Sequence, residues 1–104
     1  MLCMQGGGVS AGSYVELFES SSVGLRAQAS AAAQDILRQG RKNLTIGLDN
    51  LSTVSDGAVA AVIVALRTMR ESGGTIRLFT RNSEHRRQLL LSGLDRIMMV
   101  VTEL

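Results

Sequence analysis

The chain of 104 residues has no proline, no tryptophan and a single cysteine, Cys3. One cysteine excludes an internal disulfide and a thiolate metal cluster. Because His85 is the only histidine, we expect no metal site of ordinary ligand spacing. Aromatic residues make up only 3% of the chain, which argues against nucleic-acid binding by base stacking. We therefore expect no metal, no cofactor and no nucleic-acid partner.

Long hydrophobic runs are also absent. The longest uninterrupted run, residues 58–66, is far shorter than the roughly 20 residues that a membrane-spanning helix needs. Residues 1–4 lead into glycines and not into the apolar core of a signal peptide. The 11 basic and 9 acidic residues nearly cancel, so a net charge of +2 does not require an acidic partner. These features predict a cytoplasmic protein without membrane insertion.

What remains is a composition typical of one folded domain, 45% hydrophobic and 19% charged. The glycine-rich residues 1–13 are expected to be flexible or to form a short first strand, and residues 14–104 to form the domain. Hydrophobic periodicity predicts strands over 14–18, 44–48, 75–79 and 97–101, and helices over 25–38, 59–71 and 83–91. This alternation predicts a single α/β domain with a four- or five-stranded mixed sheet and helices packed on it.

The residue types of common catalytic sites are not found together. His85 lies in a charged segment that predicts an exposed position at the start of a helix, without a serine or cysteine partner. The glycine-rich patterns that bind phosphates do not occur. Asp49 and Asp56 flank one strand-to-helix junction, and an acid–base pair there is the alternative that would make the protein an enzyme. We expect that it is not one.

The junction after the second expected strand is the most unusual stretch of the chain. There Ser55, Asp56 and Gly57 interrupt an apolar run just before a helix. The Asp56 carboxylate is predicted to cap this helix and to stabilise it by about 1 kcal/mol through hydrogen bonding and the helix dipole. Ser55 is predicted to be a cap or turn residue.

Three segments, residues 44–58, 70–79 and 84–97, together match the sequence pattern of one known domain family. The match needs no gap from Leu44 to Leu104. Its most characteristic parts are SGLDRI at 92–97 and ESGG at 71–74, before a strand. In these parts the sequence resembles the STAS domain family of anti-sigma factor antagonists. The resemblance implies a STAS-like domain that binds an anti-sigma factor with serine-kinase activity of the GHKL type and is released when it is phosphorylated.

The resemblance also assigns roles to individual positions. It places the phosphorylated serine of the family on Asp56, and the usual aspartate of the preceding strand on Gly47. Asp56 has a permanent negative charge and no hydroxyl, so it could mimic part of the phosphorylated state, while Ser55 is the alternative phosphorylation site. The implied partner interface consists of Asp49, Asn50, Ser55, Asp56, Gly57, Ala58, Ala60 and Ala61.

Two functions are consistent with this pattern. The leading hypothesis is a non-enzymatic antagonist in a partner-switching system of transcription regulation, with Asp56 at the phosphoswitch position. The alternative is a STAS accessory subunit of a lipid-transport ABC system, or another constitutive STAS interaction module. A site without a phosphorylatable serine suits the alternative at least as well.

Overall fold

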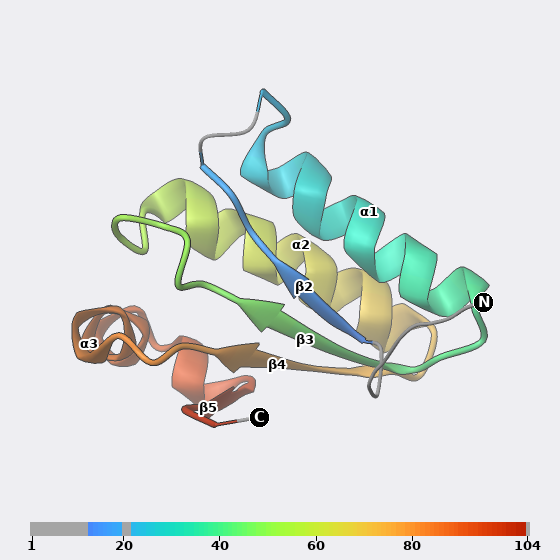
Figure 1. The fold of residues 1–104 in the computed structure, drawn as a ribbon. Coiled ribbons are helices and arrows are strands. Elements are labelled where there is room, and N and C mark those ends of the chain that lie inside the picture. Colours follow the sequence, from blue (N-terminus) through green and yellow to red (C-terminus); the bar gives the residue numbers. More distant parts are fainter. Residues whose placement is uncertain (1–12, 20–21, 104) are drawn as a thin grey trace.

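The computed structural model describes residues 13–19 and 22–103, which form alternating strands and helices (Figure 1). The elements in chain order are β2 (Tyr14–Glu16), α1 (Leu25–Arg38), β3 (Asn43–Gly47), α2 (Asp56–Glu71), β4 (Thr75–Phe79), α3 (Ser83–Ser92), the 3₁₀ helix η2 (Leu94–Arg96) and β5 (Met99–Val101). The predicted α/β alternation is confirmed. The first strand considered within residues 1–13 falls almost entirely outside the described residues.

The four described strands form one sheet in the order β2-β3-β4-β5, and every neighbouring pair is parallel. The predicted mixed sheet is therefore wrong for this part of the chain. Each of these strands is joined to the next through a helix that returns the chain to the same end of the sheet, and this makes neighbours parallel. As a result, the loops after β2, β3 and β4 all lie at the same end of the sheet, where the strands have their carboxyl ends.

The hydrophobic core lies between the sheet and the helix pair α1 and α2, which run side by side over one face (Figure 1). Leu44 and Ile46 of β3, and Leu48 just after it, are at most 1% exposed and belong to this core. Alanines line the contact between the helices, including Ala33 of α1 and Ala65 of α2, both 0% exposed. Small side chains let two helices approach closely. The apolar first half of α2 is thus covered by neighbours, as its sequence predicts.

The opposite face of the sheet has a small cluster around Phe79. The Tyr14 ring stands edge-on to Phe79 with 5.9 Å between the ring centroids, and the Arg81 guanidinium lies 5.7 Å from the Phe79 centroid. A Cβ atom on Gly47 would lie only 2.2 Å from the Tyr14 hydroxyl oxygen. Glycine at this position therefore lets the tyrosine ring lie across β3, and an aspartate there would have to displace it.

Candidate functional site

The start of α2 is capped by Ser55 and not by Asp56. Ser55 has an extended backbone (φ −75°, ψ 169°), and its Oγ accepts a hydrogen bond from the Ala58 N–H at 3.2 Å. Asp56 is the first residue of the helix, so the prediction that it is the N-cap is wrong. Its carboxylate still lies in the first turn, where a negative charge interacts favourably with the helix dipole. The prediction for Ser55 as a cap or turn residue is confirmed.

The predicted interface residues divide into exposed and buried ones. Ser55, Asp56 and Gly57 are exposed, and the Asp56 carboxylate makes no hydrogen bond or ion pair with any residue that the structure describes. Ala58 and Ala61 are 0% exposed and pack in the core, so their side chains cannot touch a partner and leave the interface. Ala60, one position before Ala61, is half-buried.

Asp49 joins the loop after β3 to the loop after β4, at the carboxyl end of these strands. Its Oδ1 accepts a hydrogen bond from the Thr80 hydroxyl at 2.6 Å, and its Oδ2 accepts one from the Arg81 N–H at 3.0 Å. Burial acts to raise the pKa of Asp49, but these hydrogen bonds together outweigh it and leave the pKa below its usual value. Asp49 thus fixes the position of the loop after β3, and its carboxylate is already occupied by donors of its own chain.

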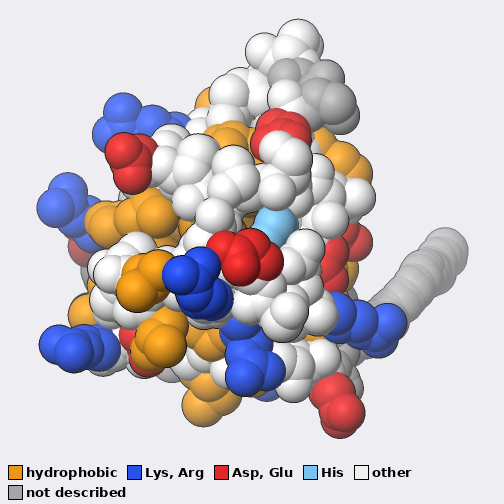
Figure 2. Space-filling view, turned by 90° about the vertical axis from the view of Figure 1, so that its left-hand side faces the viewer, with side chains coloured by type: hydrophobic (Ala, Val, Ile, Leu, Met, Phe, Trp, Pro, Cys, Tyr) orange, Lys and Arg blue, Asp and Glu red, His pale blue; other side chains and the backbone are white. Residues whose placement is uncertain are grey.

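His85 is buried, whereas the charged segment around it predicts exposure. It is 2% exposed, other side chains surround it in Figure 2, and its Nε2 lies 2.7 Å from the Leu51 carbonyl oxygen. A carbonyl only accepts, so Nε2 is the protonated nitrogen and donates. Nδ1 has no hydrogen-bond partner among the described residues. The helical period explains the burial, because His85 shares the inward face of α3 with Leu89, four residues later.

Further side chains anchor the junction loop, which we define as residues 48–55. From α3, Gln88 accepts a hydrogen bond from the Val54 N–H and donates one to the Thr53 hydroxyl, both at 2.8 Å. From the loop after β2, Glu19 accepts the Ser52 N–H at 3.0 Å, and this hydrogen bonding lowers the pKa of Glu19. The junction loop is therefore held from two sides.

Glu16 completes this anchoring, because its carboxylate accepts a hydrogen bond from the Asn50 side-chain amide. The predicted interface residue Asn50 is thus exposed but already partnered within the chain. Sequence reasoning missed Glu16, Glu19 and Gln88, since each is an ordinary polar residue and its partner is more than 30 positions away. Only the three-dimensional placement of β2 and α3 beside the loop shows their role.

Two other kinds of site, a metal centre and a membrane-spanning helix, are absent from the described residues. They contain no group of three or more histidine, cysteine, aspartate or glutamate side chains that could hold a metal ion. No helix in the described part of the chain combines the length and apolar character that crossing a bilayer requires.

Known proteins provide no further assignment. No protein-family model, no curated protein and no solved structure matches this chain. The resemblance to the STAS family therefore stays a prediction from the sequence.

Proposed function

We propose that the protein is a non-enzymatic interaction module that binds a partner protein through the exposed start of α2, in the manner of STAS-type antagonists. The observation that supports this most is an exposed tripeptide, Ser55-Asp56-Gly57, at the point where the anchored junction loop meets α2. A loop that is already ordered loses little conformational entropy on binding, which favours affinity. The partner on this proposal is an anti-sigma factor of the GHKL kinase type.

The charge of Asp56 gives the proposal its mechanism. In the family that the sequence resembles, a phosphoryl group at this position breaks the complex with the kinase. The unpartnered Asp56 carboxylate places one fixed negative charge there. A phosphoryl group would add about −1.5 to −2 charges, so Asp56 reproduces only part of its effect. If this is correct, the wild-type protein binds the kinase more weakly than an Asp56→Ser variant would. Phosphorylation at residue 56 then does not control its binding.

Recovery of partners from the source cell tests the proposal directly. Wild-type protein and Asp56→Ser are used as baits, and the bound proteins are identified by mass spectrometry. We expect a kinase-type regulator with both baits and more of it with the serine variant. Recovery of an ABC ATPase subunit without any such regulator would contradict the proposal.

Phosphorylation by the recovered kinase and ATP separates the chemistry of the site from its charge. We expect Asp56→Ser to become phosphorylated and the isosteric, uncharged Asp56→Asn to gain affinity without modification. Ser55→Ala is the matched control, because phosphate on Ser55 of the wild type would mean that the switch position is one residue earlier. Equal kinase affinity of the wild type and Asp56→Asn would contradict the role of the charge.

One observation favours the alternative, a constitutive STAS module such as an ABC accessory subunit. The only hydroxyl in the exposed tripeptide, that of Ser55, already accepts the capping hydrogen bond of α2. A permanent partner would need no modification at this site. On the alternative, Asp56→Ser leaves both the recovered partner and its amount unchanged.

A further inference from the structure

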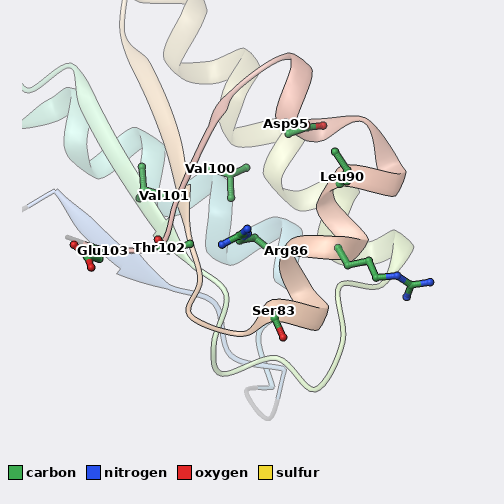
Figure 3. Close-up of a pocket in the computed structure, with 9 residues that line it drawn as sticks. Ser83, Arg86, Leu90, Asp95, Val100, Val101, Thr102 and Glu103 are labelled. Carbon is green, nitrogen blue, oxygen red and sulfur yellow. The ribbon is translucent and has the colours of Figure 1, made fainter.

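In the part of the sheet that the structure describes, the outer edge at β5 borders an open cleft. β5 is the last strand in the sheet order, and a cleft of about 870 Å³ lies between it and α3 (Figure 3). The lining includes Arg86 and Leu90 of α3, Asp95 of η2, and Val100, Thr102 and Glu103 at or after β5. The close-up shows Arg86 directed from α3 toward the β5 side of this space.

The backbone of β5 has hydrogen-bonding groups along this edge that pair with none of the described strands. The Val101 carbonyl points toward β4, since it accepts the Thr80 N–H at 3.1 Å. Peptide groups alternate in direction along a strand, so the N–H and C=O of Val100 point away from β4, toward the open edge. An added strand would satisfy them, which no compact ligand would do as completely.

This edge lacks two of the features that usually prevent strand pairing, charged side chains within the strand and proline. Charged residues and proline commonly block edges, whereas β5 reads Met-Val-Val and the whole chain has no proline, so that only its length of 3 residues limits pairing. Exposed hydrophobic side chains occur on β5 and on α3: Met99 of β5 is 63% exposed, and Leu90 and Leu91 of α3 are 62% and 72% exposed. In the view onto the α3 end of the molecule, hydrophobic side chains reach the surface among Lys and Arg side chains (Figure 2). Such a patch is typical of a protein interface.

The charges of the cleft indicate which partner fits. Arg86, Asp95 and Glu103 form no ion pair with the described residues through their side chains, whereas Arg87 already pairs with Glu84 at 3.0 Å. A partner of one sign would be attracted by one of these groups and repelled by another. A second copy of the chain carries the same positive and negative groups. In a two-fold interface, the positive groups of one copy can therefore face the negative groups of the other.

We propose that the protein forms a two-fold dimer in which β5 pairs antiparallel with β5 of a second copy, joining two four-stranded sheets into one. The outward peptide groups of Val100 form hydrogen bonds across the axis, the apolar residues of α3 and β5 flank it, and the cleft charges of one copy face the opposite charges of the other. This inference is independent of the partner bound at α2, which lies elsewhere on the molecule.

Sedimentation velocity of the full chain, from micromolar to millimolar concentration, tests the dimer. We expect the mass to rise to twice that of one chain. Val100→Pro removes an N–H that faces the edge and no hydrogen bond to β4, so the dimer dissociation constant should rise by about tenfold or more. Val100→Thr keeps the N–H and should leave association unchanged. A wild-type chain that stays monomeric throughout overturns the proposal and leaves the cleft to another molecule.

Charge reversal gives a second test that does not depend on how well proline is tolerated. Arg86→Glu makes the cleft more negative and Asp95→Lys/Glu103→Lys makes it more positive, so each variant alone should dimerise more weakly than the wild type. When the two are mixed, opposite charges face each other and a heterodimer should form more tightly than either homodimer. Misfolding of one variant would not produce this rescue. No gain on mixing contradicts the two-fold interface.

Discussion

At the scale of single residues, Tyr14 provides a direct spectroscopic prediction. The chain contains one tyrosine and no tryptophan, so tyrosinate absorbance reports Tyr14 alone. Partial burial of this side chain, which is still 36% exposed, raises the pKa of Tyr14 together with the neighbouring Glu16 carboxylate from 10.0 to about 12. The neutral phenol is thus favoured in the folded state, and its stabilisation is complete below pH 10 and lost as the pH rises toward 12. An alkaline absorbance titration should give a midpoint near 12 in the native protein and near 10 in urea.

Two variants separate the causes of this shift. Glu16→Gln removes the negative charge and should lower the native midpoint while leaving the ring in place. Gly47→Ala places a Cβ atom where the Tyr14 hydroxyl lies and should push the ring toward solvent, which brings the midpoint closer to 10. A native midpoint equal to that in urea would show that Tyr14 does not lie across β3.

His85 gives a second prediction at this scale. His85→Ala leaves the Leu51 carbonyl without its donor and opens a cavity, and we expect it to lower the free energy of unfolding by about 2–4 kcal/mol. His85→Gln keeps an N–H donor of similar reach and should lose about half as much. Urea unfolding curves measure both. Equal losses would mean that packing, and not the hydrogen bond to Leu51, accounts for the stabilisation.

At the scale of elements, the two polar side chains at the start of α2, those of Ser55 and Asp56, differ in what they stabilise. Ser55→Ala removes the side-chain cap and should lower the free energy of unfolding by about 1 kcal/mol. Asp56→Asn removes only an exposed charge from the first turn and should cost no more than about 0.5 kcal/mol, less at high salt. Thermal and urea unfolding of both variants distinguish the roles. The reverse order would restore Asp56 as the capping residue.

The elements also show where sequence patterns are informative. The hydrophobic period predicts α1 at its observed bounds, whereas α2 begins at Asp56 and not at Val59. Serine and aspartate both cap helices well, and only the backbone geometry at Ser55 decides between them. The last strand was predicted over 97–101, but the turn that closes η2 takes up its first residues and β5 begins at Met99.

At the scale of the whole molecule, the alternation of strands and helices predicts an α/β domain, but not that every neighbouring pair of described strands is parallel, and it does not predict the candidate site. The exposed tripeptide at 55–57 is visible in the sequence because polar residues interrupt an apolar run. Its anchoring depends on α3 lying beside the junction loop, where His85 reaches Leu51 and Gln88 reaches Val54, 34 positions apart in each case. No local pattern encodes such a contact. The exposed tripeptide could therefore be predicted from the sequence, and the side chains that anchor the junction loop could not.

Burial is distributed unevenly over the molecule, and this predicts how it opens. α2 buries six residues, whereas α3 buries only His85 and Leu89, and β5 has no buried residue. Regions with few buried apolar side chains open at a lower free energy than the core. In native-state hydrogen exchange, the amides of α3, η2 and β5 should therefore open by a subglobal unfolding about 1–3 kcal/mol below the amides of β3 and α2. Equal opening free energies throughout would contradict this division.

One hydrogen bond joins the region of α3, η2 and β5 to the core, and its removal tests the predicted difference in opening free energy more directly. Arg70 of α2 donates from its guanidinium to the Ile97 carbonyl at 3.0 Å, just before β5. Arg70→Ala should lower the opening free energy of η2 and β5 by about 1 kcal/mol and change that of β3 less. Arg67→Ala is the matched control, since Arg67 is exposed and makes no hydrogen bond or ion pair with the described residues. A β5 dimer would protect the outward Val100 amide. Its hydrogen exchange should therefore slow as the protein concentration rises, and the same experiment then also reports on dimer formation.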